Sequence, residues 1–134
     1  MINLIQPATL NIVLIDDSDL IIARITQLIE IVENVNIVGT ASNVYSGFEI
    51  VNKEKPNVVI LDIQLDKDNP NQNGMMLLTQ IKSALPETKV IMLTNHFIDL
   101  YKEKCLTNGA DYFLDKSNDF DKIPDILNEL FDEN

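Results

Sequence analysis

Short apolar runs alternate along the chain with longer segments in which apolar residues recur every three or four positions. The runs lie at residues 11–15, 35–40, 57–61, 89–93 and 110–114. Three of them are nearly continuous, as is required of strands that are buried on both faces of a parallel sheet. We therefore expect five strands in one sheet, with helices on both of its faces.

The segments between the runs have the spacing of amphipathic helices. In the first segment, Ile21, Ile25 and Leu28 recur every three or four residues, and Ser18 or Asp19 precedes them as a helix cap. Further helices are expected near residues 43–54, 74–84, 97–107 and 119–131.

Five strands that alternate with five helices give a (βα)5 order. Because parallel strands are joined by right-handed crossovers, this order predicts an α/β fold, a three-layer sandwich with helices on both sides of the sheet. A length of 134 residues and a hydrophobic content of 46% suit a single domain with its own core. We place that domain at residues 11–134, after an N-terminal extension at residues 1–10.

Aspartates follow two of the predicted strands at the point where each strand ends. Asp16 and Asp17 close the first apolar run, and Asp62 closes the third. In open α/β sheets, ligands bind in the crevice beyond the carboxyl ends of the strands, and these two strands can be neighbours there. Three unpaired carboxylates would repel one another, whereas Mg2+ combines one or two carboxylates with water and phosphate oxygens. The three aspartates therefore predict a magnesium site.

Two further polar residues lie at the same predicted edge of the sheet. Thr94 closes the fourth run and Lys116 follows the fifth. Each residue alone is weak evidence, because strand-end hydroxyls, turn aspartates and solvated lysines are common. Together the five residues provide Mg2+ ligands, an acceptor carboxylate, a hydroxyl and an ammonium group, which phosphoryl transfer to a side chain needs. Five such residues at the ends of four strands form a specific pattern.

This pattern resembles the receiver domains of two-component response regulators, and the resemblance extends over residues 11–131. It implies a flavodoxin-like fold with strand order 2-1-3-4-5. It also implies that Asp62 is the phosphoacceptor, that Asp17 binds Mg2+ directly and that Asp16 binds it mainly through water. Asp62 and the backbone carbonyl of Gln64 would be further ligands, and Mn2+ could take the place of Mg2+.

The same resemblance implies roles for residues around the phosphoacceptor. Thr94 and Lys116 would bind phosphoryl oxygens, and Thr94 and Phe113 would form a switch that alters the surface of the fourth helix, the fifth strand and the fifth helix. Alternatively, Phe113 is an ordinary aromatic residue of a strand, with no switch role. Gln64 and His96, each two residues after a site residue, would modulate the hydrolysis of the acyl phosphate.

The resemblance also implies partners, and the composition bears on them. A receiver would take its phosphoryl group from a histidine kinase or a histidine phosphotransfer protein and control a downstream protein, as a monomer or a phosphorylation-dependent dimer. The formal net charge of -11 argues against direct binding of nucleic acid or an anionic membrane, and no run approaches the roughly 20 apolar residues of a membrane span. The single Cys105 and the lack of a secretory signal favour a cytoplasmic location.

The sequence departs from the family pattern at three places. Gly74 lies farther beyond Asp62 than is usual, so the polar loop at residues 65–73 is enlarged, a change that a surface loop tolerates at small cost. Ser117 stands where the family commonly has a proline that follows a cis peptide bond. The chain stops soon after the fifth predicted helix, which leaves open whether it is a stand-alone receiver or an excised domain.

Three alternative functions would use the same architecture. A pseudo-receiver that binds partners without being phosphorylated is disfavoured by the complete set of site residues. A phosphohydrolase with an aspartyl-phosphate intermediate usually has an acid two residues after its nucleophile. Gln64 occupies that position after Asp62, although Asp17 and Asp19 at the end of the first strand could supply such a pair. The hypothesis that the chain binds a flavin rests on fold analogy alone. We expect no enzyme activity beyond phosphorylation and dephosphorylation of the chain itself.

Overall fold

Strands and helices alternate along the part of the chain that the computed structural model describes, residues 9–65, 73–95 and 99–133. The strands are β1 (Leu10–Ile15), β2 (Val35–Ala41), β3 (Val58–Asp62), β4 (Lys89–Thr94) and β5 (Tyr112–Asp115). The helices are α1 (Asp19–Glu30), α2 (Val44–Glu54), α3 (Gly74–Ala84), α4 (Asp99–Thr107) and α5 (Lys122–Glu133). The predicted order of elements is confirmed, and none of these described helices is long and apolar enough to cross a membrane.

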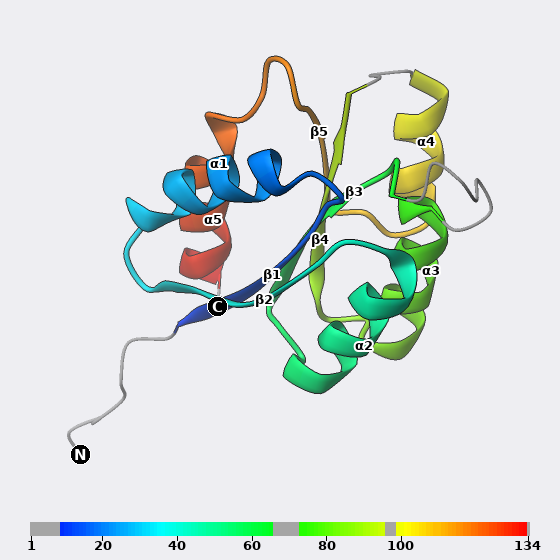
Figure 1. The fold of residues 1–134 in the computed structure, drawn as a ribbon, viewed down its shortest axis with the longest axis horizontal. Helices are drawn as coiled ribbons and strands as arrows, with labels where there is room; N and C mark the ends of the chain where they lie inside the picture. The colour runs from blue at the N-terminus through cyan, green and yellow to red at the C-terminus, as the bar shows by residue number, and fades with distance from the viewer. Residues whose placement is uncertain (1–8, 66–72, 96–98, 134) are drawn as a thin grey trace.

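The strands form one parallel sheet in the order β2-β1-β3-β4-β5. Helices α1 and α5 lie on one face of this sheet, and α2, α3 and α4 lie on the other (Figure 1). The predicted three-layer, flavodoxin-like fold is therefore confirmed. Because the chain moves from β1 to one neighbour and then crosses to the other, the switch point of the sheet lies between the ends of β1 and β3.

Alternate residues of the central strands belong to two separate cores. Ile12 and Ile60 pack in the cluster that includes residues of α1 and α5, whereas Val13 and Val59 pack in the cluster that includes residues of α2 and α3. All five residues of β3 are buried. A strand that is buried on both faces cannot move without exposing apolar surface, so the residue at its carboxyl end is held firmly in place.

Polar side chains cap two of the helices that begin at this edge of the sheet. The Ser18 hydroxyl accepts a hydrogen bond from the Ile21 amide at 3.3 Å, so Ser18 rather than Asp19 is the N-cap of α1. The Asn73 side chain accepts hydrogen bonds from the amides of Met75 and Met76 at 2.9 and 3.1 Å, which starts α3. Since these caps satisfy amides that would otherwise lack partners, they determine where the loops at the sheet edge end.

Candidate functional site

The strand register brings Asp16 and Asp62 side by side. Ile15, the last residue of β1, is paired with Leu61 of β3, so Asp16, which follows β1, and Asp62, which ends β3, lie at the same edge of the sheet. Asp16 stays attached to the sheet because its amide donates to the Ala41 carbonyl at 3.0 Å. Both side chains are buried, with Asp16 3% and Asp62 2% exposed. Two adjacent carboxylates are thus withdrawn from water.

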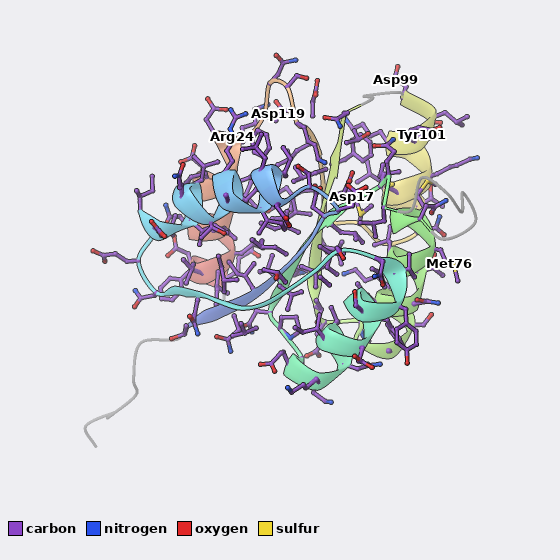
Figure 2. All side chains as sticks on the ribbon, in the orientation of Figure 1. Asp17, Arg24, Met76, Asp99, Tyr101 and Asp119 are labelled. Carbon is purple, nitrogen blue, oxygen red and sulfur yellow. The ribbon has the colours of Figure 1, made fainter. Side chains whose placement is uncertain are left out.

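Asp17 brings a third carboxylate to this edge. Ligand oxygens of Asp16, Asp17 and Asp62 all lie within 4.8 Å of one another, and Asp17 is the exposed member of the group. Figure 2 shows Asp17 where β1 gives way to the loop that leads to α1. Carboxylate oxygens at this spacing, with one side open to water, suit a hard divalent cation such as Mg2+, which keeps several of its waters. The three residues predicted from the sequence do form a group that can hold a metal ion.

Within the described part of the chain, Lys116 provides the positive charge that contacts this group. Its Nζ lies 2.6 Å from Asp16 Oδ2 and 3.3 Å from Asp62 Oδ2, and its side chain is only 4% exposed. The backbone amide of Lys116 donates to the Thr94 carbonyl at 2.8 Å, which anchors the residue to the end of β4. One ammonium group therefore faces two buried carboxylates, and a second cation would complete the charge balance.

Burial and charge together change the acidity of Asp62. Burial, and after it the neighbouring Asp16 carboxylate, raise the pKa of Asp62 to about 6, although Lys116 and the Gln64 amide act in the opposite direction. That amide donates to Asp62 Oδ1 at 3.2 Å. A proton and a metal ion therefore compete for Asp62 near neutral pH, and a bound cation favours the ionised carboxylate.

The Ser18 amide is a part of the site that the sequence analysis missed. This amide donates to Asp16 Oδ1 at 2.9 Å, while the Ser18 hydroxyl caps α1. Asp16 is thus held by the first turn of α1 as well as by Lys116. An aspartate that accepts from the amide two residues later is a common local motif, so the sequence Asp-Asp-Ser already contained the signal.

Thr94 and Phe113 lie at the far side of the same edge. Thr94 ends β4, is 0% exposed, and pairs in the β-ladder with Asp115, the residue before Lys116. Phe113 is 8% exposed and packs in the core cluster on the α2, α3 and α4 face, together with Cys105. The fold thus places Thr94 beside the lysine, whereas Phe113 belongs to the neighbouring core. His96, expected to modulate hydrolysis, lies outside the described residues.

Two of the three departures from the family pattern have clear local geometry. The Gly74 amide donates to the Ile63 carbonyl at 2.8 Å, and the Leu65 amide contacts the same oxygen at 3.1 Å. The two ends of the enlarged loop therefore meet at one carbonyl beside Asp62; residues 66–72 between them lie outside the described part. The Lys116–Ser117 peptide bond is trans.

A sequence profile of the response regulator receiver domain matches residues 12–128. This stretch contains the three aspartates, Thr94 and Lys116. The chain therefore belongs to the response regulator receiver domain family, which operates in two-component signal transduction. Receiver domains exchange signals with histidine kinases and downstream effectors, and in general they are not enzymes that act on other substrates.

Individual relatives agree with this assignment. The transcriptional regulatory protein LnrK of Bacillus subtilis (strain 168) is 30% identical over 114 residues, which cover 85% of this chain and 50% of that protein. The response regulator protein VraR of Staphylococcus epidermidis is 23% identical over 123 residues, which cover 92% of this chain and 57% of that protein. The chain thus spans about half the length of these two relatives.

Solved structures share the fold. A LuxR-family two-component response regulator from Aurantimonas sp. SI85-9A1 superposes with a TM-score of 0.84 at 19% identity, over 94% of this chain and 87% of that chain. A chain of the CheX–CheY–BeF3–Mg complex from Borrelia burgdorferi superposes with a TM-score of 0.81 at 25% identity, over 92% of this chain and 90% of that chain. Both likenesses extend over almost the whole receiver fold.

Proposed function

We propose that this receiver domain accepts a phosphoryl group on Asp62 and, in the phosphorylated form, controls a partner protein. The convergence of Asp62 with Asp16, Asp17 and Lys116 supports this proposal most directly. Three carboxylate oxygens lie within 4.8 Å of one another, and an ammonium group contacts two of the three residues. Such a site has an acceptor and the means to neutralise the charge of a phosphoryl group.

In the proposed reaction, one oxygen of the ionised Asp62 carboxylate attacks the phosphorus of a phosphohistidine. The new bond is between that oxygen and phosphorus, and the bond that breaks joins phosphorus to the imidazole nitrogen, which leaves with the electron pair and takes up a proton. Lys116, already 3.3 Å from Asp62 Oδ2, would then pair with a phosphoryl oxygen, and the Thr94 hydroxyl would donate to another. Water later hydrolyses the acyl phosphate.

The acidic residues would hold the cation that this reaction needs. Asp16, Asp17, Asp62 and the backbone carbonyl of Gln64 would bind Mg2+, or Mn2+ in its place, with Asp16 acting mainly through water. When bound, the cation supplies positive charge that stabilises the phosphoryl oxygens. Its charge would also favour the ionised form of Asp62, whose pKa is raised to about 6, chiefly by burial.

The partners follow from the receiver family. The donor would be a histidine kinase or a histidine phosphotransfer protein, and the domain at residues 11–134, after the extension at 1–10, would act in the cytoplasm as a monomer or a phosphorylation-dependent dimer. Movement of Thr94 toward the phosphoryl group would let Phe113 change its packing. Since Phe113 lies on β5, this change would alter the surface of α4, β5 and α5, to which a downstream protein binds.

Intact-protein mass spectrometry after incubation with acetyl phosphate and Mg2+ tests this function. The native protein should gain about 80 Da, the increment of one phosphoryl group on a carboxylate, and EDTA should prevent the gain. Asp62→Asn should show no increment, whereas Asp111→Asn, which removes a carboxylate remote from the site, should behave like the native protein. If the native protein gains no mass while another receiver treated alongside does, the chain works as a binding module without phosphorylation.

A further inference from the structure

The chain that follows Lys116 is a turn held by two aspartates, one on each side of the lysine. Asp115 Oδ1 accepts from the Ser117 amide at 2.8 Å, and Asp115 Oδ2 accepts from the Asn118 side-chain amide at 3.1 Å. In the reverse direction, Asp119 Oδ2 accepts from the Asp115 amide at 2.8 Å. The Asp119 amide also donates to the Asp115 carbonyl at 2.9 Å. The turn is therefore closed by reciprocal bonds between residues 115 and 119.

Both ends of this turn are attached to the rest of the domain. At its start, the Lys116 amide donates to the Thr94 carbonyl at 2.8 Å. At its end, Phe120 is 5% exposed, and the Arg24 guanidinium of α1 lies 4.3 Å from the centre of its ring, a cation–π contact. Arg24 and Asp119 are labelled in Figure 2, on α1 and on the connection that rises beyond β5. The turn thus bridges the sheet edge and α1.

This arrangement matters because Lys116 has to reach two buried carboxylates with a flexible side chain. Its four-carbon stem loses substantial rotamer freedom when it is fixed in one geometry. The direction in which the stem leaves the backbone is set by residues 115–117, and each flanking amide is engaged by a carboxylate. Loosening the turn would let the Lys116 ammonium move away from Asp16 and Asp62.

The Asp119 carboxylate makes a polar interaction with each of its two oxygens. Hydrogen bonding from the Asp115 amide and from Lys122 holds the pKa of Asp119 below its ordinary value, and Lys122 Nζ lies 2.9 Å from Asp119 Oδ1. The Asp119 side chain is 16% exposed. One oxygen of this carboxylate therefore faces the surface lysine, while the other holds the backbone beside Lys116.

We propose that Asp119 is a positioning residue for phosphoryl transfer: through the Asp115 amide it holds the backbone that aims Lys116 at Asp16 and Asp62. The inference rests on the proposed function of Lys116 as the group that pairs with the phosphoryl oxygens. It assigns Asp119 no contact with the phosphoryl group or the metal ion.

Three variants separate the two bonds of Asp119. Asp119→Ala removes the acceptor for the Asp115 amide, Asp119→Asn keeps an oxygen for it, and Lys122→Met removes only the surface ion pair. With acetyl phosphate and saturating Mg2+, Asp119→Ala should lower the maximal phosphorylation rate about ten-fold with little change in the apparent KM for the donor. Asp119→Asn and Lys122→Met should stay within about two-fold of the native rate. Equal loss in Lys122→Met would assign the effect to the surface pair and overturn the proposal.

Dependence on Lys116 is tested by combining substitutions. In a Lys116→Ala background, which has already lost the ammonium group, Asp119→Ala should cause no further decrease in the rate. An undiminished ten-fold decrease in that background would show that Asp119 acts by another route, and would overturn the proposal. If Asp119→Ala does not fold, Asp119→Glu takes its place, because the longer side chain keeps the charge but misplaces the acceptor for the Asp115 amide.

Chemical labelling gives a readout that does not depend on phosphorylation. Lys116 is 4% exposed, so acetic anhydride followed by peptide mass mapping should label it slowly in the native protein and several-fold faster in Asp119→Ala. Lys82, which is 16% exposed and lies 2.8 Å from Asp111, serves as the control and should not change. Unchanged labelling of Lys116 overturns the positioning role. If the native protein is never phosphorylated but Lys116 is labelled faster in Asp119→Ala, the proposed function is refuted while the positioning role of Asp119 stands.

Discussion

Gly74 packs directly against the backbone of Asp62. A Cβ at position 74 would overlap the Asp62 carbonyl oxygen and lie 2.8 Å from both the Asp62 carbonyl carbon and Ile63 Cα. The Gly74 amide also donates to the Ile63 carbonyl at 2.8 Å. The start of α3 is therefore fitted to the proposed phosphoacceptor without room for a side chain, although the loop before it is longer than is usual in receivers.

Gly74→Ala should lower both stability and phosphorylation. Because the added methyl group meets backbone rather than the end of a side chain, α3 or β3 has to move, which typically costs about 1–3 kcal/mol. The shift would displace Asp62, so the rate of phosphorylation by acetyl phosphate should fall by about ten-fold or more. Urea unfolding measures the first effect, and intact-protein mass at timed intervals measures the second.

Gly47→Ala is the matched control for this substitution. A Cβ at Gly47 of α2 would lie 2.9 Å from Leu77 Cδ2 and 3.1 Å from Ile15 Cδ1, which are the ends of side chains. These atoms can rotate, and alanine gains up to about 1 kcal/mol of helix propensity over glycine. We expect a smaller loss of stability and a native phosphorylation rate. Equal effects of the two variants would show that Gly74 has no special relation to Asp62.

The raised pKa of Asp62 should make stability depend on pH in the absence of divalent cations. Its pKa is about 6 in the folded protein against an ordinary value of 3.8, so the folded state binds the proton more tightly than the unfolded state does. This favourable contribution is complete below pH 3.8, decreases as the pH rises through the interval, and is absent above pH 6. The titration of Asp62 should therefore make the free energy of unfolding of the native protein decrease toward pH 7.

Asp62→Asn removes that titration. Relative to the native protein in EDTA, the variant should gain stability between pH 4.5 and pH 7.5, by about 1–3 kcal/mol in total, because a neutral amide neither loses hydration as a charge nor repels Asp16. Urea unfolding at a series of pH values measures the difference. A difference between the two proteins that stays constant across this range would show that Asp62 does not titrate there.

The positions of the strands were predictable because the signals are local and repeated. The buried strands are continuous apolar runs, and most of the helices between them have amphipathic spacing; the exception is α4, in which only Cys105 is buried. Asp16, Asp17 and Asp62 could also be expected to converge, because the carboxyl ends of parallel strands share one edge, and their ligand oxygens do lie within 4.8 Å of one another. Family membership was likewise predictable from the ordered set of polar residues.

Contacts that depend on three-dimensional fit could not be predicted in the same way. Nothing local indicates that Gly74 lies against Asp62, since the two are separated by a loop and meet only when α3 docks on the sheet. The bond from the Asp115 amide to Asp119 depends on the path of the turn after β5. A switch role for Phe113 would depend on a change in its packing, which the residue type and its place on β5 do not encode.

Asp17 should contribute more to Mg2+ affinity than to stability. It is the exposed member of the carboxylate group, so Asp17→Asn leaves no buried charge unpaired and should change the free energy of unfolding by less than about 0.5 kcal/mol. Loss of one carboxylate ligand should weaken Mg2+ binding about ten-fold or more, as measured by isothermal titration calorimetry. Asp19→Asn, which changes an exposed acid in the first turn of α1 outside the group, should bind Mg2+ like the native protein.

Lys116 should be essential for stability only while both buried carboxylates are charged. Lys116→Met removes the ammonium group that lies 2.6 Å from Asp16 and 3.3 Å from Asp62, and uncompensated buried charge typically costs about 3–5 kcal/mol. In EDTA at pH 8, urea unfolding should show a loss of this order. The loss should be smaller at pH 5, because Asp62, with a pKa of about 6, is then largely protonated.

Two comparisons identify charge as the cause of this loss. Adding Mg2+ at pH 8 should restore stability to Lys116→Met, because the cation replaces the missing positive charge next to the carboxylates. The double variant Asp16→Asn/Lys116→Met should regain part of the lost stability without Mg2+, because Asp16→Asn removes one of the two carboxylate charges that repel each other. A loss that is the same at pH 5 and pH 8, and that neither Mg2+ nor Asp16→Asn relieves, would instead point to the packing of the lysine stem. In that case the ammonium would contribute little to the site in its unphosphorylated state.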